Sequence, residues 1–224
     1  MLALLLALAA AQADKAASML GATDLDPARV LPPPPAPGSA QARAELAELR
    51  TRQASRTAQQ KDAAERTGET KNATIFAGVL GPRFDLARLP ATARLLAIVR
   101  ATEKEAIDRG KDHFARQRPW IVDPSLTPCK LGKEPLSSYP SGHATNAYAM
   151  AAVLAQLVPA KAPALMARAA EYAETRITCE QHWRSDLTAG EAFGLLLAER
   201  LMAKPAFRAV FTQAQVELAA AGIR

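Results

Sequence analysis

The sequence predicts an all-α, single-domain helical bundle, and three observations favour that class. Of the 224 residues, 49% are hydrophobic and 22% are charged, which suits a chain with a sizeable core and excludes a wholly disordered one. Alanine and leucine dominate, and aromatic residues make up only 5%. These side chains lose little rotamer freedom in a helix. Strand-like alternation of useful length is absent from the sequence, as is any internal repeat.

The charge balance limits the classes of partner. Lys and Arg number 28 against 22 Asp and Glu, for a net charge of +6. A mild positive excess suits anionic small molecules or acidic surfaces. The chain has no dense basic run with interleaved aromatic residues, so nucleic acid is not predicted as a partner.

The N-terminus predicts export. Met1–Ala10 contains only Leu and Ala after the first residue, and this run is much shorter than the roughly 20 residues of a membrane-spanning helix. It ends at Ala11-Gln12-Ala13, a small-x-small cleavage pattern. We therefore expect residues 1–13 to be a signal peptide and the mature protein to be periplasmic or secreted, without stable membrane insertion. The apolar run has no preceding Lys or Arg, which leaves open a start further upstream, and a buried apolar helix is the alternative.

Two cysteines, Cys129 and Cys179, are present in the chain. In an exported protein an even number of cysteines favours a disulfide, whereas two separate buried thiols are the alternative.

Residues 14–38 are expected to form an extended, Pro-rich segment. Leu31–Gly38 reads LPPPPAPG, and because proline fixes φ and lacks an N–H, this stretch should adopt polyproline II geometry. The helical domain is expected over residues 39–224. Ser39 is placed to cap a polar run, Ala40–Thr67, whose alternating charges predict one solvent-facing helix at the domain edge.

The remaining elements follow from apolar periodicity and helix breakers. An amphipathic helix is expected from about Pro90 to Phe114, and Pro119 marks its limit. A loop of about twenty residues then covers 120–138, and loops of this length are usually functional or disordered. Further helices are expected at about residues 142–157, 161–177, 185–202 and 205–221.

The first of three polar clusters contains Lys111 and Arg118. They are seven residues apart, and on a continuous helix this spacing of two turns would place both cations on one face. Taken alone, such a pair is more typical of a solvated basic face, and an anion-binding surface is the alternative. His113, between them, is assigned no role.

The second cluster is Ser141-Gly142-His143 at the start of a predicted helix. The free N–H groups of a helix N-terminus bind anions, and glycine allows an anion to approach the backbone closely. Ser141 could add a hydroxyl donor, and His143 would project beside the anion from the first turn. An ordinary N-cap with an incidental histidine is the alternative.

The third cluster contains His182 and Asp186, four residues apart, with Arg176 before them. On a helix the carboxylate would meet one imidazole nitrogen and leave the other free to attack, as in an activated nucleophile. A structural His–Asp surface pair is one alternative. A metal site is another, although the chain has three histidines and no HExxH or paired-cysteine pattern.

Taken in order, the motifs K-x6-R-P, P-S-G-H and R-x5-H-x3-D resemble the type-2 phosphatidic acid phosphatase superfamily, which includes vanadium haloperoxidases. The chain is most similar to the secreted class A bacterial non-specific acid phosphatases. That similarity rests on LPPPPAPGS at 31–39, on residues 111–119, on SYPSGH at 138–143 and on C-x-x-H-W-x-S-D from Cys179. It spans roughly residues 31–215 and implies the helical bundle of that superfamily.

The resemblance implies a phosphate cradle. Lys111, Arg118 and Arg176 would hold the non-bridging oxygens of the phosphoryl group. Ser141 and the backbone of Gly142 would complete the cradle. Three cations provide the dispersed positive charge that phosphoryl transfer needs, so neither a metal nor another cofactor is expected.

The resemblance also implies the catalytic residues. His182 would attack phosphorus and form a phosphohistidine, and Asp186 would orient it. His143 would protonate the leaving alcohol and then activate water. The sequence departs from the pattern of that family at two places. Thr175 stands where serine is usual, and Glu180-Gln181 stands where the family has small residues. Glu180 would put a negative charge close to His182, with Arg184 as its expected counter-ion.

We therefore expect an exported, metal-independent acid phosphatase of broad specificity that acts on small-molecule phosphate monoesters. A homo-oligomer is left open. The alternatives are a vanadate-dependent haloperoxidase, a lipid phosphatase, which the lack of membrane spans disfavours, and a catalytically weakened phosphate-binding envelope protein.

Overall fold

The computed structural model describes residues 16–224, and all regular structure in that range is helical, which confirms the all-α class. The signal-peptide prediction for residues 1–13 lies outside the described residues. The elements are α1 (Pro27–Val30), α2 (Ala40–Ser55), α3 (Ala58–Glu69), η1 (Ala73–Phe76), α4 (Ala77–Leu80), α5 (Pro90–Phe114), α6 (Pro119–Val122), α7 (Gly142–Leu157), η2 (Pro159–Lys161), α8 (Ala162–Thr178), α9 (Arg184–Ala203) and α10 (Pro205–Ala220). Among residues 16–224 no helix is both long and apolar enough to cross a membrane.

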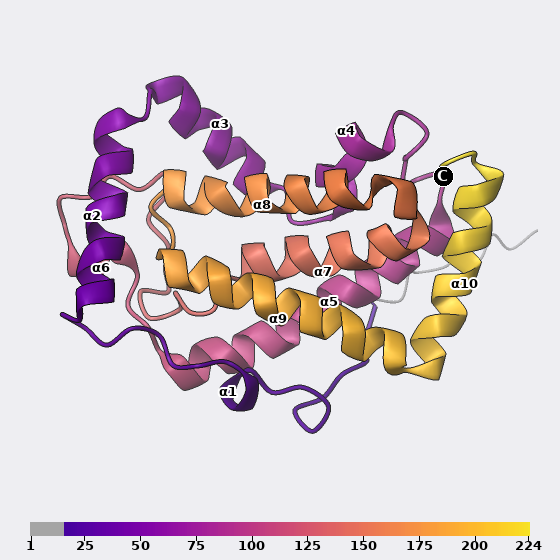
Figure 1. The fold of residues 1–224 in the computed structure, drawn as a ribbon, viewed down its shortest axis with the longest axis horizontal. Helices are drawn as coiled ribbons and strands as arrows, with labels where there is room; N and C mark the ends of the chain where they lie inside the picture. The colour runs from indigo at the N-terminus through magenta and orange to yellow at the C-terminus, as the bar shows by residue number, and fades with distance from the viewer. Residues whose placement is uncertain (1–15) are drawn as a thin grey trace, which may run out of the picture.

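Helix α7 forms the centre of the bundle, between α8 and α9 (Figure 1). Its sequence is rich in alanine, and most of its side chains are buried. Two glycines of α9 face it closely: a Cβ at Gly190 would lie 2.7 Å from the Ser141 carbonyl oxygen, and one at Gly194 would lie 2.5 Å from that of Thr145. Because glycine has no side chain, α9 can approach α7 closely enough to bring their N-termini together.

The helix directions gather the polar clusters at one end of the bundle. The C-terminal ends of α5 and α8 lie there with the N-terminal ends of α7 and α9, on the left in Figure 1. Helix N-termini carry partial positive charge, so this end favours an anion.

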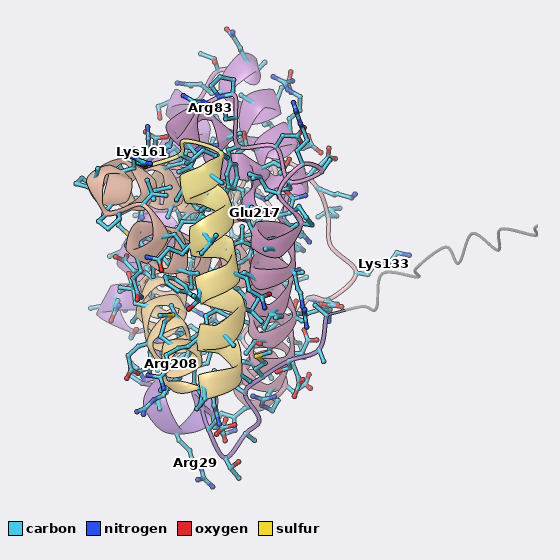
Figure 2. All side chains as sticks on the ribbon, turned by 90° about the vertical axis from the view of Figure 1, so that its right-hand side faces the viewer. Arg29, Arg83, Lys133, Lys161, Arg208 and Glu217 are labelled. Atoms are coloured by element: carbon cyan, nitrogen blue, oxygen red, sulfur yellow. A yellow bond between two sulfur atoms is a disulfide. The ribbon has the colours of Figure 1, made fainter. Side chains whose placement is uncertain are left out.

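Helix α10 crosses the opposite end of the molecule, which faces the viewer in Figure 2. Its Glu217 accepts hydrogen bonds from the backbone N–H groups of Ala91 and Thr92, at 3.0 and 2.8 Å. These groups belong to the first turn of α5, which has no side-chain cap of its own at Leu89. Glu217 thus caps α5 from another helix.

The expectation of one solvent-facing helix over residues 40–67 is wrong. The run divides at Arg56, and Thr57 starts α3 with a capping box that involves Gln60. One face of each helix is buried, including Leu49 of α2 and Gly68 of α3. Helix α3 packs on α8 (Figure 1), which makes the segment part of the bundle and not merely its edge.

The expectation that Lys111 and Arg118 share a helix face is also wrong. Helix α5 ends at Phe114, and Ala115 adopts a left-handed conformation with φ of 44°. Arg118 therefore comes after a change of chain direction, at the N-cap of α6. The loop predicted for 120–138 begins within this short helix.

The Pro-rich segment lies along the domain surface. Residues 31–36 have no regular hydrogen-bonded structure, as expected, and the Tyr139 hydroxyl donates to the Pro32 carbonyl at 2.6 Å. The segment before it contains the short helix α1, capped by the Asp26 side chain. The expectation of an extended segment is therefore wrong at Pro27–Val30, which is helical.

Candidate active site

A cavity of about 280 Å³ opens at the end of the bundle where the clusters meet. Five of the predicted residues line it: Lys111, Arg118, Gly142, His143 and His182. Arg176 lines an adjoining cavity of about 530 Å³, which shares His143 with the first. Ser141 and Asp186 are fully buried behind the wall. The fold thus brings all three clusters into one region.

His182 lies in the turn between α8 and α9, two residues before α9 begins. Its Nδ1 is 3.2 Å from Asp186 Oδ2, and its Nε2 is 2.9 Å from Arg118 Nη1. A guanidinium only donates hydrogen bonds, so this network assigns the proton to Nδ1 and leaves the Nε2 lone pair facing Arg118. The predicted His–Asp contact is present, although it forms across the start of α9 and not between two helical turns.

Burial and positive charge keep this imidazole neutral. The pKa of His182 is well below its usual range, first because the ring is buried and then because Arg118, Lys111 and Arg176 lie near it. A neutral ring with an unprotonated Nε2 is the form required of a nucleophile.

The carboxylate of Asp186 is held by donors from three directions. It accepts hydrogen bonds from Arg116 at 2.6 Å, from the Ser138 hydroxyl at 2.5 Å and from the Trp183 N–H at 2.9 Å. Burial raises the pKa of Asp186, and these donors oppose that rise. Arg116 also contacts Glu45 of α2 at 2.8 Å. Arg116, Ser138 and Glu45 were given no role in the sequence analysis, although Arg116 lies within residues 111–119 and Ser138 begins the SYPSGH motif.

The start of α7 forms the floor of the site. Ser141 is the N-cap, and its hydroxyl oxygen accepts from the Ala144 N–H at 3.4 Å. A Cβ at Gly142 would lie 3.2 Å from Glu103 Oε1. Any larger residue at Gly142 would therefore crowd the cavity floor.

Three cations in this region have no acidic partner. Lys111, Arg118 and Arg176 form no ion pair with any carboxylate of residues 16–224. Burial lowers the pKa of Lys111, and it lowers the pKa of Arg118 to about 10. Unpaired, partly buried cations favour a bound anion, because an anion would offset both desolvation and mutual repulsion.

Helix α3 positions Arg176 and His143. The Arg176 guanidinium donates to the Ala64 carbonyl at 2.6 Å and packs against Gly68, where a side chain would collide with it. His143 Nε2 lies 3.0 Å from the Gly68 carbonyl oxygen. No motif in the sequence marks this helix, and Gly68 is a site residue that was missed.

The predicted charge of Glu180 beside His182, with Arg184 as its counter-ion, is not what the structure shows. Glu180 is fully buried, does not line the cavity and lies 2.9 Å from Arg56, in a left-handed conformation with φ of 53°. Arg184 is not its counter-ion, because it pairs with Glu48 and Glu174. Gln181 lines the cavity, and its carbonyl accepts from Arg118 at 2.6 Å.

The predicted disulfide is present between Cys129 and Cys179. It joins the loop after α6 to the residue that follows α8, and the Cys129 N–H donates to the Cys179 carbonyl at 3.2 Å. The bridge therefore holds the chain three residues before His182.

A family model described as the PAP2 superfamily matches residues 91–208, just over half of the chain, and this range contains every predicted site residue. The chain belongs to the PAP2 superfamily. A solved structure of a transmembrane PAP2-type phosphatidylglycerolphosphate phosphatase from Bacillus subtilis shares the fold, with a TM-score of 0.55 and 18% identity over 70% of this chain and 82% of that one.

Three curated relatives of this PAP2 protein are named as phosphatases. An acid phosphatase of Zymomonas mobilis is 37% identical over 120 residues, 51% of this chain and 45% of the relative. A non-specific acid phosphatase of Salmonella typhi is 31% identical over 65% of this chain and 60% of its own length. Another, from Providencia stuartii, is 28% identical over 87% of this chain and 82% of the relative. The chain thus spans about half of the first of these relatives and three fifths of the second.

Glu103 is a further acidic residue of the PAP2 site that the sequence did not reveal. It lines the cavity from α5, is 1% exposed and pairs with Arg100. Burial raises its pKa from 4.5 to about 7, against the opposing charges of Arg100 and Lys111. Its carboxyl group is therefore partly protonated near neutral pH.

The raised pKa predicts a pH-dependent effect of Glu103→Gln on stability. A carboxyl whose pKa is raised by folding stabilises the protein below pH 4.5, and this contribution is lost as the pH rises through about 7. From pH 4 to pH 8 the free energy of unfolding of the wild type should fall, relative to that of the variant, by about 3 kcal/mol. Urea unfolding of both proteins at several pH values measures this difference. Parallel pH profiles would contradict the assignment.

Proposed function

We propose that this protein is an exported, metal-independent phosphatase of broad specificity that hydrolyses small-molecule phosphate monoesters through a phosphohistidine on His182. The observation that carries the proposal is the orientation of His182. Its unprotonated Nε2 lies 2.9 Å from Arg118, at a cavity that Lys111 and His143 also line. The acid phosphatase names of the curated relatives support the same activity.

In the first step the ester phosphate binds among the cations. Lys111, Arg118 and Arg176 hold the non-bridging oxygens, and the start of α7 supplies backbone N–H groups. His182 Nε2 then forms a bond to phosphorus while the bond from phosphorus to the alcohol oxygen breaks. The alcohol oxygen takes a proton from His143, and Asp186 stabilises the imidazolium through the Nδ1 proton.

In the second step water replaces the histidine. His143, now neutral, takes a proton from the water as its oxygen bonds to phosphorus, and the P–N bond to His182 breaks. Inorganic phosphate leaves, and His182 returns to its neutral form with the proton on Nδ1. Each histidine ends the cycle as it began.

The protonation of His143 is expected to make the reaction faster at acidic pH. Burial, and then the charge of Arg176, hold the pKa of His143 well below its usual range. A phosphate dianion bound between these cations would raise that pKa, because an anion favours the protonated ring. Substrate binding and low pH therefore both charge the proton donor.

The proposed location is the periplasm or the exterior of the cell. A disulfide next to the active site suits an oxidising compartment. On this proposal residues 1–13 are the leader and residues 39–224 form the catalytic domain. The Pro-rich segment between them packs on that domain through Tyr139.

Turnover of 4-nitrophenyl phosphate in the presence of EDTA tests the function. We expect activity to persist, since three side-chain cations supply the charge that two metal ions supply in other phosphatases. Vanadate and inorganic phosphate should inhibit competitively because they occupy the same cradle. A metal-dependent phosphatase treated in parallel should lose activity. Loss of activity on chelation, restored by a divalent ion, would contradict the mechanism.

A further inference from the structure

A fourth cation, Lys71, lies at the active site without a role in the proposed mechanism. It is in the segment between α3 and η1 and lines both the catalytic cavity and the adjoining one. The only other residues common to the two cavities are His143 and Gln181. Lys71 lies outside residues 91–208, the range of the PAP2 family match.

The backbone around Lys71 is fixed to the helices of the site. The Lys71 carbonyl accepts from Asn146 of α7 at 3.2 Å, and the Thr70 carbonyl accepts from the Tyr172 hydroxyl of α8 at 2.7 Å. Two residues earlier, the Gly68 carbonyl lies 3.0 Å from His143 Nε2. The exposed side chain of Lys71 therefore extends from an anchored backbone.

The charge of Lys71 is not neutralised by the protein. Two other cations that line the cavity have acidic partners, because Arg100 pairs with Glu103 and Lys104 pairs with Asp108. Lys71 has no such partner within residues 16–224. Partial burial and the charges of Arg100 and Arg176 lower the pKa of Lys71. A bound anion would offset both the loss of solvent and the repulsion between these cations.

The position of Lys71 relative to His143 indicates which part of the substrate it meets. His143 gives its proton to the leaving oxygen, so the leaving alcohol lies on the His143 side of the phosphoryl group. Lys71 lines both cavities that meet at His143 and is exposed to solvent, so it lies where the far end of that alcohol would extend.

We propose that Lys71 binds an anionic group on the leaving alcohol, and that the preferred substrates are small phosphate esters with a second negative charge, a carboxylate or another phosphate. The inference rests on the proposed phosphatase function. It narrows the substrate class, because an ester of a neutral alcohol would leave Lys71 without a partner.

Three esters on one three-carbon frame test the inference. Glycerol 3-phosphate has a neutral leaving group, 3-phosphoglycerate adds a carboxylate, and glycerol 1,3-bisphosphate adds a phosphate. For each protein variant, the kcat/KM for 3-phosphoglycerate and the kcat/KM for glycerol 1,3-bisphosphate are each divided by the kcat/KM for glycerol 3-phosphate. Such a ratio does not depend on the fraction of folded enzyme.

We expect Lys71→Met to lower this ratio by up to about fivefold, the upper end of the range for an exposed charge pair. Lys71→Arg should retain it, and added salt should reduce it in the wild type. Arg208→Gln removes one positive charge from α10, at the end of the molecule opposite the cavity (Figure 2), and should leave the ratio unchanged. The ester with the larger loss identifies the preferred anion.

One result would overturn the inference while the phosphatase function stands: an unchanged ratio in Lys71→Met. If kcat/KM itself falls equally on all three esters, the unchanged ratio would place Lys71 on the transferred phosphoryl group; if kcat/KM does not fall, Lys71 has no part in binding. If the wild type hydrolyses none of the three esters, nor 4-nitrophenyl phosphate, the proposed function itself fails and the inference falls with it.

Discussion

Replacement of His182 by alanine is expected to lower kcat for phosphate esters by at least about 10³-fold while the protein remains folded. The nucleophile forms the bond that divides the reaction into two steps, and effects of this size or larger follow its removal in other enzymes. The neighbours of His182 remain in place, since Asp186 keeps its hydrogen bonds to Arg116, Ser138 and Trp183.

Steady-state turnover of 4-nitrophenyl phosphate measures this effect, and thermal unfolding checks the fold. His113→Ala is the matched control, because His113 is exposed at the end of α5 and does not line the cavity. That variant should retain wild-type activity. Turnover by folded His182→Ala within tenfold of the wild type would exclude His182 as the nucleophile.

Replacement of Arg118 by alanine is expected to lower kcat/KM by about 10²-fold or more, the size of effect seen when an oxyanion donor is removed. Arg118 donates to His182 Nε2 at 2.9 Å and to the Gln181 carbonyl at 2.6 Å. These contacts position the nucleophile, and in the proposed mechanism Arg118 also binds the phosphoryl oxygens. Its loss should weaken inhibition by phosphate and vanadate as well.

Arg118→Lys separates charge from geometry. A lysine keeps the positive charge but lacks the planar fork that binds two oxygens at once, so it should restore only part of the activity. Inhibition constants for phosphate, measured alongside kcat/KM, show whether binding and turnover change together. An unchanged phosphate inhibition constant in Arg118→Ala would contradict the role of Arg118 in the cradle.

The parts of the site that could be predicted are those with local signals. Lys111, Gly142 and His182 were identified from short motifs, and all three line the cavity. The disulfide followed from two cysteines and an expectation of export. The all-α fold class and the approximate ends of most helices followed from apolar periodicity, because this pattern depends only on residues that are close in sequence.

The parts that could not be predicted depend on contacts between distant segments. Glu45 contacts Arg116 and the Ser185 N–H, and no local pattern links residues 140 positions apart. The alternating charges of residues 40–67 looked like a solvated surface, although Gly68 at the end of α3 packs against Arg176. The argument from the spacing of Lys111 and Arg118 failed because it needs one continuous helix, whereas α5 ends at Phe114 and the chain turns at Ala115.

During turnover His182 Nε2 is expected to carry the phosphoryl group, and this intermediate can be trapped. The wild type is mixed with a ³²P-labelled phosphate ester, denatured within milliseconds and digested at alkaline pH, where phosphohistidine is stable. We expect label on the peptide that contains His182, loss of that label in mild acid, and no label in His182→Ala. Label on another residue, or none during rapid turnover, would exclude His182 as the carrier of the phosphoryl group.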